Sequence, residues 1–184
     1  MKTLIVIDMQ NDFVTGTLGT IEAQAILPNV KKKIEEYREH GDEIIFTRDT
    51  HFSDTYIDSN EGKNLPIIHC IKNTQGWDIV EEIDITDCEH IDKTSFGYSY
   101  WDLKESNKGI DKRIFEEIEI IGVCTDICVV SNALILKALF PEISITVDAS
   151  CCAGVTPESH KHALETMKMC QISVINEIPD AINE

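Results

Sequence analysis

The sequence predicts an α/β protein with three layers, in which a doubly wound, mainly parallel sheet carries helices on both faces. Short apolar runs alternate with amphipathic helical patterns from one end of the chain to the other, which is typical of strand–helix units around a parallel sheet. The chain also has 184 residues without an internal repeat or a break in composition, and a typical domain has about 150 residues. We therefore expect a single domain over residues 1–184.

The first part of the chain contains two predicted strands around one predicted helix. Thr3–Ile7 is a short apolar run that predicts a buried strand. Apolar side chains then recur at helical spacing between Pro28 and Gly41, and glycine commonly ends helices. Glu43–Thr47 predicts the second strand. The helical side chains are Ile26, Val30, Ile34 and Tyr37.

The middle of the chain has weaker patterns. Residues 50–76 combine glycine, proline and many polar residues without clear periodicity, and they predict a long loop. Long loops in compact domains are usually functional. After this loop we expect a short helix over Trp77–Ile83, a strand over His90–Asp92 and a second short helix over Tyr98–Lys104.

The last part of the chain predicts three strands and two helices. Thr125 or Asp126 is placed to cap a buried helix that reaches Phe140 before a proline stops it. Thr156–Pro157 supplies a cap and a first-turn proline for a helix that ends near Cys170. The expected strands are Glu117–Val123, Ile143–Val147 and Ile172–Ile175.

Charge and hydropathy exclude several classes of protein. The chain has 16 Lys and Arg against 33 Asp and Glu, a net charge of −17, so a phosphate backbone would be repelled and nucleic acid is not an expected partner. Only four apolar residues follow Met1–Thr3, which is too few for a signal peptide. No stretch approaches the roughly 18 apolar residues of a membrane span. We therefore expect a cytoplasmic protein without membrane contact.

The seven cysteines are an odd number without a CxxC pair, so neither a disulfide framework nor a zinc ribbon is expected. Most of them are expected to be reduced and buried as small apolar side chains. Cys151 and Cys152 are neighbours, and two buried thiols are the preferred interpretation over a strained disulfide.

Ligands of parallel sheets bind beyond the carboxyl ends of the strands, so polar residues that follow each predicted strand are the candidates for a site. Several side chains remote in sequence would then share one edge of the sheet. These candidates are Asp8, Asp49, His51, Lys93, Cys124 to Cys128, and Asp148 to Cys152.

Three of these candidates suit nucleophilic chemistry. Cys128 lies in the first turn of a predicted helix, where the helix dipole stabilises a thiolate. Asp8 ends an apolar strand, where a buried carboxylate needs a partner. Lys93 follows a strand as well. Each also has an ordinary interpretation: a buried thiol, a turn aspartate and a surface lysine.

A carboxylate and imidazoles gather around the long loop. Asp49-x-His51 followed by His69 is a ligand set suited to zinc, iron or manganese, and Glu61 in the same loop is a candidate fourth ligand. The alternative is that loops contain Asp and His because they are solvated.

Short motifs carry a family resemblance over nearly the whole chain. They are Asp8-Met9-Gln10-Asn11-Asp12-Phe13, Asp49-Thr50-His51, His69-Cys70, Lys93-Thr94-Ser95-Phe96-Gly97 and Gly122-Val123-Cys124-Thr125-Asp126-Ile127-Cys128-Val129. In this order and spacing they resemble the isochorismatase-like cysteine hydrolases, and within them the nicotinamidases.

The resemblance implies a catalytic triad of Asp8, Lys93 and Cys128 that hydrolyses an amide through an acyl-thioester. It also implies an oxyanion hole from the backbone N–H groups of Cys124 and Cys128, with a cis peptide bond before Cys124. Phe13 would then stack against a flat substrate.

In nicotinamidases a metal orients the substrate's ring nitrogen, and the resemblance assigns Asp49, His51 and His69 to this role with Glu61 as a fourth ligand. The expected cofactor is a divalent metal, with zinc preferred over iron or manganese. The expected substrate is a small, planar, nicotinamide-like amide, and related hydrolases commonly form homo-oligomers.

The substrate is left open by three departures from the nicotinamidase pattern. Leu65-Pro66-Ile67-Ile68 replaces a Trp-Pro stretch, the segment after Lys93 differs, and Cys124 stands where alanine is frequent. The alternatives are an isochorismatase-type vinyl-ether hydrolase, which needs no metal ligands, another small-amide or ureido hydrolase of the family, and an inactive relative that only binds a ligand. Dinucleotide binding is disfavoured because no Gly-x-Gly-x-x-Gly follows a strand.

Overall fold

The computed structural model describes residues 1–106 and 109–177, and it contains a six-stranded sheet in which every strand is parallel to its neighbours. The strand order is β3-β2-β1-β6-β7-β8. The α/β class with a mainly parallel sheet is therefore confirmed. The single domain expected over residues 1–184 includes residues 107–108 and 178–184, which lie outside the described residues. The strands are β1 (Lys2–Ile7), β2 (Glu43–Asp49), β3 (Glu89–Lys93), β6 (Glu117–Val123), β7 (Ser144–Ala153) and β8 (Ser173–Ile175).

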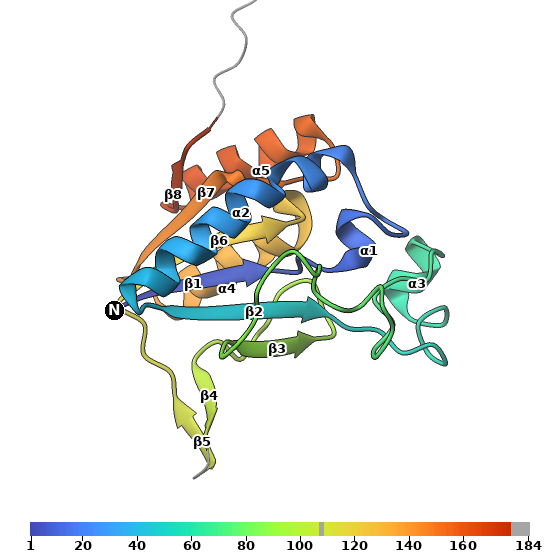
Figure 1. Ribbon diagram of the computed structural model, residues 1–184, viewed down its shortest axis with the longest axis horizontal. Coiled ribbons are helices and arrows are strands. Elements are labelled where there is room, and N and C mark those ends of the chain that lie inside the picture. Colours follow the sequence, from blue (N-terminus) through green and yellow to red (C-terminus); the bar gives the residue numbers. More distant parts are fainter. Residues whose placement is uncertain (107–108, 178–184) are drawn as a thin grey trace, which may run out of the picture.

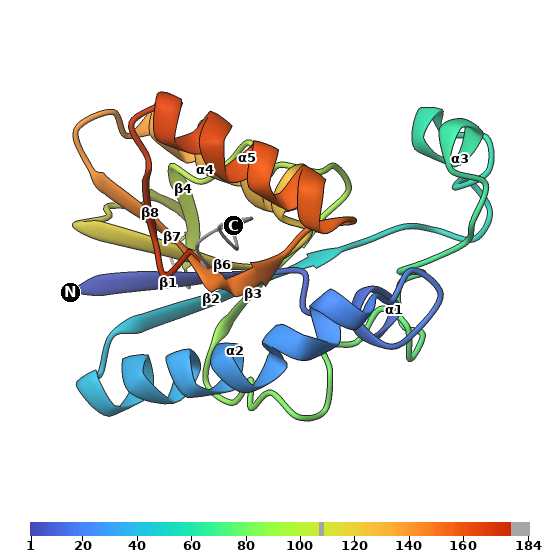
Figure 2. The same cartoon turned by 90° about the horizontal axis from the view of Figure 1, so that it is seen from above.

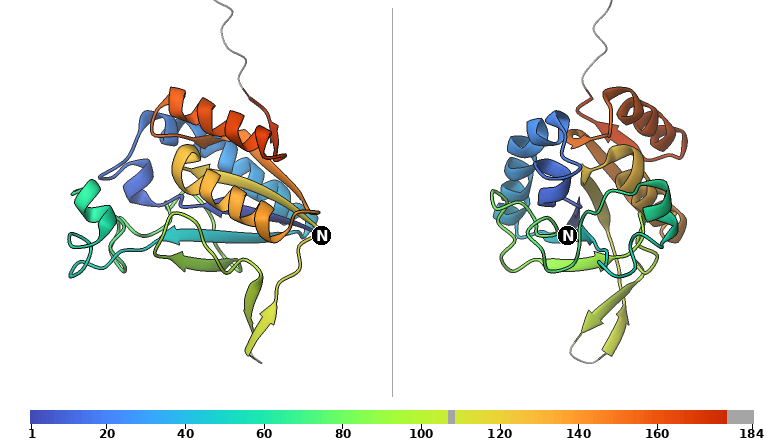
Figure 3. Two further views of the ribbon diagram at one scale, coloured as in Figure 1. Left: turned by 180° about the vertical axis from the view of Figure 1, so that it is seen from behind. Right: turned by 90° about the vertical axis from the view of Figure 1, so that its right-hand side faces the viewer.

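Helices cover both faces of the sheet, which makes three layers (Figure 2). The α2 helix (Ile21–His40) lies on one face with the short α1 (Asn11–Val14), and α4 (Val130–Leu139) and α5 (Pro157–Met169) lie on the other, which is the face seen from behind in Figure 3. Because side chains alternate along a strand, the central β1 contributes to both cores. Leu4 and Val6 pack on the α2 side, and Ile5 and Ile7 on the α4 side.

The α2 helix begins earlier than the predicted helix. The hydroxyl of Thr20 accepts a hydrogen bond from the Ala23 N–H and caps the helix, and Pro28 lies inside it. Proline removes one helical hydrogen bond, and the exposed position of Pro28 leaves the freed carbonyl accessible to water. Gly41 ends the helix with φ 70°, as glycine at this position predicts.

Two of the predicted short helices are wrong. Trp77–Ile83 forms turns, because the Val80 N–H bonds to the Met9 carbonyl and Ile79 forms a bridge with Gln10. Tyr98–Lys104 forms a turn that leads into β4 (Leu103–Ser106), which pairs antiparallel with β5 (Gly109–Lys112) in a hairpin that projects from the body (Figure 1). In these two segments the apolar residues are spaced for burial against the sheet layers, and the backbone is not helical.

The other connections differ in detail from the predictions. A π-helical turn, η1 (Thr125–Val129), precedes α4, and neither Thr125 nor Asp126 caps it. The capped start of α5 at Thr156 is confirmed, with a reciprocal pair of bonds to Ser159. The long loop after β2 contains a short helix, α3 (Asn60–Asn64). Among the described residues, no helix combines the length and apolar character that a bilayer crossing requires.

Candidate active site

The carboxyl ends of four adjacent strands bring the predicted residues together. Asp8 follows β1 with φ 49°, Asp49 ends β2, Lys93 ends β3, and Cys128 lies in the π-helical turn after β6. Asp49 and Lys93 are register partners of neighbouring strands. Since β3, β2, β1 and β6 are consecutive in the sheet, side chains from residues 8 to 128 meet at one edge.

Asp8, Lys93 and Cys128 form a buried cluster. The Lys93 Nζ lies 2.7 Å from the Asp8 Oδ2 and 3.5 Å from the Cys128 Sγ. The exposed fractions of the three residues are 0%, 2% and 4%. The Thr47 hydroxyl donates to the Asp8 Oδ1 at 2.7 Å, and Lys93 also donates to the Ser95 carbonyl at 3.2 Å.

Burial keeps the thiol protonated in this cluster. It raises the pKa of Cys128 well above its usual value, and the Lys93 charge offsets only part of this effect. The helix-dipole prediction of a lowered pKa is therefore wrong. Burial also raises the pKa of Asp8 despite Lys93. Burial lowers the pKa of Lys93, but the negative groups around it outweigh burial and raise it. Cys128 therefore requires a base, and Asp8 is the adjacent carboxylate.

The segment before the nucleophile has the expected backbone. The peptide bond between Val123 and Cys124 is cis. Gly122 has φ 116°, and a Cβ there would lie 2.1 Å from the Ile7 carbonyl oxygen, so only glycine fits between β6 and β1. The Cys124 carbonyl accepts bonds from the Ile127 and Val129 N–H groups.

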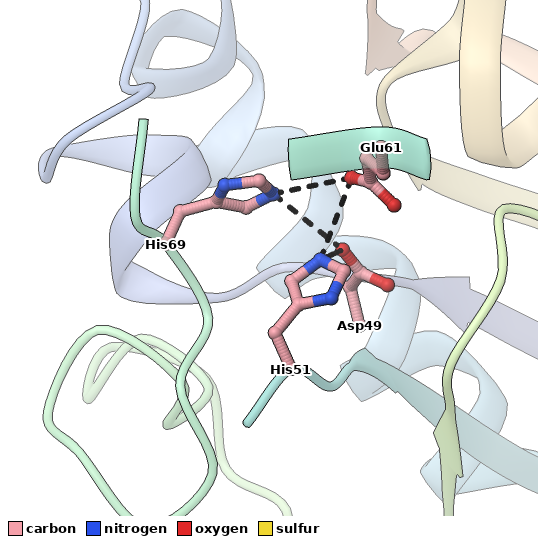
Figure 4. Close-up of side chains that lie close together, drawn as sticks. All are labelled: Asp49, His51, Glu61 and His69. Atoms are coloured by element: carbon pink, nitrogen blue, oxygen red, sulfur yellow. Dashed lines mark ion pairs between the residues drawn. The ribbon is translucent and has the colours of Figure 1, made fainter. Parts of the chain in front are cut away.

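A second cluster lies beside the first. Asp49 and His51 come from the end of β2, Glu61 from α3 and His69 from the following loop, and they point toward one another (Figure 4). Their ligand atoms all lie within 4.8 Å of one another. The His51 Nε2 is 3.0 Å from the Asp49 Oδ2 and 3.4 Å from the Glu61 Oε1. The His69 Nε2 is 3.6 Å from the same Glu61 oxygen.

The donor set fits a divalent cation. The buried His51 Nε2 makes no hydrogen bond of acceptable geometry. The His69 Nδ1 bonds to the Ile67 carbonyl at 2.8 Å, which leaves the Nε2 lone pair directed at the cluster. Burial lowers the pKa of His51, but Asp49 and Glu61 outweigh burial and raise it to about 9. A metal ion would supply the positive charge that this arrangement favours.

Gln10 holds Asp49 in place. Its buried side chain accepts a bond from the Asp49 N–H at 2.7 Å and donates to the Asp49 carbonyl at 2.9 Å and the Trp77 carbonyl at 2.8 Å. The sequence suggested no such role for Gln10, although it lies two residues after Asp8.

One cavity of about 740 Å³ opens onto both clusters. Phe13 lines it, with its ring centroid 5.6 Å from that of His69. Cys124 and Cys128 also line it. The remaining apolar walls are Leu18, Leu65, Phe96, Ile127 and Val155. Leu18 and Val155 lie outside the segments that the sequence singled out.

The candidates after the fifth predicted strand do not reach this site. β7 runs to Ala153, so Asp148 lies inside the strand and not at its end. Asp148 pairs with Lys33 of α2 at 2.9 Å. Cys151 and Cys152 are buried free thiols, as expected. His160 of α5 lies near the carboxyl edge of the sheet, with its Nδ1 2.8 Å from the Thr125 hydroxyl.

Comparison with known proteins identifies a family and several relatives. The isochorismatase domain family matches residues 2–177. The chain is 26% identical to the nicotinamidase of Saccharomyces cerevisiae, over 96% of this chain and 100% of that protein. It is 30% identical to a probable inactive nicotinamidase of Arabidopsis thaliana, over 90% of this chain and 87% of that protein. The structure of a pyrazinamidase of Pyrococcus horikoshii in complex with zinc superposes with a TM-score of 0.75 and 28% identity, covering 96% of this chain and 99% of that one.

Proposed function

The chain belongs to the isochorismatase family and is a hydrolase of small amides, and we propose that it acts through Cys128 as a covalent nucleophile. The observation that carries the proposal is the buried cluster in which the Lys93 ammonium lies 2.7 Å from the Asp8 carboxylate and 3.5 Å from the Cys128 sulfur. A protonated thiol beside a carboxylate of raised pKa is the arrangement that general-base activation needs.

In the first half of the proposed reaction, Asp8 takes the thiol proton of Cys128 and the sulfur attacks the amide carbonyl carbon. Lys93 lies between the two negative groups and stabilises both. The C–N bond then breaks, and Asp8 returns the proton to the nitrogen, so that ammonia leaves and an acyl-thioester remains. In the second half, Asp8 removes a proton from water and the water oxygen attacks the acyl carbon. The C–S bond then breaks, Asp8 returns the proton to the sulfur, and the acid is released with the thiol restored.

The oxyanion of each tetrahedral intermediate is assigned to the backbone N–H groups of Cys124 and Cys128. Both residues line the cavity, and backbone donors preorganised in this way are worth roughly 3 to 4 kcal/mol in the transition state.

Asp49, His51, Glu61 and His69 are proposed to hold a divalent metal, and zinc is preferred because two imidazole nitrogens and two carboxylates are a set that it binds. A bound metal would supply a Lewis-acidic position that holds and orients a substrate nitrogen. Phe13 and the apolar walls of the cavity support a flat, small amide of the nicotinamide type. The protein is further proposed to be a homo-oligomer, which light scattering tests.

The test is release of ammonia from a panel of small aromatic and aliphatic amides, with ureido compounds and a vinyl ether included. We expect turnover of aromatic amides by protein with about one equivalent of bound metal. Cys128→Ala is expected to abolish turnover, while Cys170→Ala, which removes an exposed cysteine, leaves it unchanged.

Equal activity of Cys128→Ala and the unmodified protein would eliminate the nucleophile assignment. Binding of amides without any turnover would place the protein with relatives of the inactive type instead.

A further inference from the structure

A buried amide side chain joins the two segments that carry Lys93 and Cys128. Asn132 lies in α4, one helical turn beyond Cys128, and has no exposed surface. Its Nδ2 donates to the Cys128 carbonyl at 2.8 Å and the Phe96 carbonyl at 3.1 Å. Its Oδ1 accepts from the Tyr98 N–H at 2.9 Å and from an indole N–H, that of Trp101, at 3.0 Å. These four bonds use both donors and both lone pairs of the amide.

The loop held by Asn132 is the one that follows β3. The two backbone groups that it binds, on Phe96 and Tyr98, flank Gly97. A Cβ on Gly97 would lie 2.4 Å from the Ile135 Cδ1, so this loop packs directly on α4. Asn132 therefore fixes the loop where Gly97 packs on the helix.

The same loop fixes the Lys93 ammonium. The Ser95 carbonyl, one residue before Phe96, accepts a hydrogen bond from the Lys93 Nζ at 3.2 Å. Asn132 thus contacts the backbone that carries the Cys128 sulfur and also the loop that holds the Lys93 ammonium through Ser95. It can therefore influence the distance between the ammonium and the sulfur.

We infer that Asn132 is a positioning residue for the proposed reaction, because it sets the separation of the Lys93 ammonium from the Cys128 sulfur through four hydrogen bonds. It does not line the cavity, so it acts through its neighbours. The catalytic part of this inference rests on the proposed function. Since a displacement of about 1 Å near reacting groups can cost on the order of 100-fold in rate, loss of Asn132 has a measurable effect.

The test compares Asn132→Leu with Leu136→Ala. Leu136 lies one turn further along α4 and is also fully buried, but its apolar side chain can make no hydrogen bond to the loop or to the Cys128 backbone. At a temperature where melting curves show each variant to be fully folded, Asn132→Leu should lower kcat/KM by about 10- to 100-fold. Leu136→Ala should keep kcat/KM while its Tm falls.

The pH profile separates positioning from stability. The Lys93 charge lowers the pKa of Asp8, so a displaced ammonium should move the acidic limb of kcat/KM to higher pH in Asn132→Leu. A residue that only stabilises the fold would not move this limb, and the Leu136→Ala profile should match that of the unmodified protein.

Hydrogen exchange of the amides of residues 95–98 gives a measurement independent of turnover, and it should be faster in Asn132→Leu than in Leu136→Ala. If the unmodified protein hydrolysed no amide, the proposed function would fail while this measurement still tested the positioning. Unchanged exchange, or an unchanged profile and rate in a folded variant, would overturn the inference. If Asn132→Leu does not fold, Asn132→Asp decides by the same readouts, because it keeps two accepted bonds and loses both donated ones.

Discussion

Lys33 and Lys93 both pair with carboxylates, and Lys93 also lies 3.5 Å from the sulfur of Cys128, which lines a cavity. In α2, Lys33 lies 2.7 Å from Glu119 and 2.9 Å from Asp148, between the helix and the sheet. At the carboxyl edge, Lys93 lies 2.7 Å from Asp8 and contacts the sulfur of the proposed nucleophile. The two clusters have the same kinds of charge, so their surroundings must account for any difference in function.

The carboxylates of the two clusters differ in basicity. Burial acts on Asp148, but hydrogen bonds from Ser150 and Asn176 and the ion pair with Lys33 outweigh it and lower its pKa. Burial dominates at Asp8 and raises its pKa. A carboxylate surrounded by fixed donors is suited to structure, whereas one with few donors beside a thiol is suited to proton transfer.

The largest expected difference is in activity. Asp8→Asn removes the proposed base and should lower kcat/KM by about 10²- to 10⁴-fold. Asp148→Asn removes a carboxylate of similar burial from the structural cluster and should leave kcat/KM within a few-fold while its Tm falls. Ammonia release and melting curves measure the two effects. Comparable losses of activity in both variants would remove the distinction between the clusters.

Metal removal tests the proposed metal ligands, which lie beside Lys93 and not in the Lys33 cluster. Asp49 faces His51, one of the other proposed metal ligands, through one oxygen and lies 3.5 Å from the Lys93 Nζ through the other. Chelation should remove the metal and lower kcat/KM, and addition of zinc should restore it. Glu61→Gln should weaken metal binding at least about tenfold and lower kcat/KM as well. Glu158→Gln, on the exposed start of α5, is the control. Full activity of metal-free protein would exclude a role for this ligand set.

The sequence predicted the residues at the carboxyl edge of the sheet more clearly than the ion pair of Lys33 and Asp148, for a physical reason. Asp8 follows a strand that was visible as an apolar run, and Lys93 follows the weaker predicted strand His90–Asp92, although in the structure it is the last residue of β3. Asp148 also followed an apolar run, but β7 continues past it because Lys33 compensates the buried charge from a distant helix. Partners that lie far apart in sequence leave no local pattern, which also explains why Asn132 was not predicted.

Partners that are distant in sequence also explain why helices were wrongly predicted over Trp77–Ile83 and Tyr98–Lys104. Trp77 and Val80 have helical spacing, but they are held by contacts with Thr50 and Met9. Tertiary hydrogen bonds decided these segments, and propensity did not.

At acidic pH, the effect of pH on the unfolding free energy should have opposite signs for Asp148 and Asp8. The lowered pKa of Asp148 means that the unfolded chain binds this proton more readily, so its contribution to folding is complete above the unfolded pKa, about 3.9. That contribution is lost as pH falls through the lower folded value. The raised pKa of Asp8 has the opposite sign.

Asp148→Asn should therefore flatten the fall in unfolding free energy below about pH 5, and Asp8→Asn should not. Urea unfolding at several pH values measures this difference. Equal flattening in both variants would contradict the assigned signs.

The smallest expected effect concerns Phe13, which lines the same cavity as Cys128. An aromatic contact beyond burial is worth about 0.5 to 1.5 kcal/mol, so Phe13→Leu should raise KM for an aromatic amide by roughly two- to tenfold. KM for a small aliphatic amide should change little, because leucine keeps the apolar surface. Phe140→Leu, whose ring packs on Phe115 in the other core, controls for lost stability. Equal changes in KM for both substrates would indicate that Phe13 only shapes the core, and the flat substrate would then lose its proposed stacking partner.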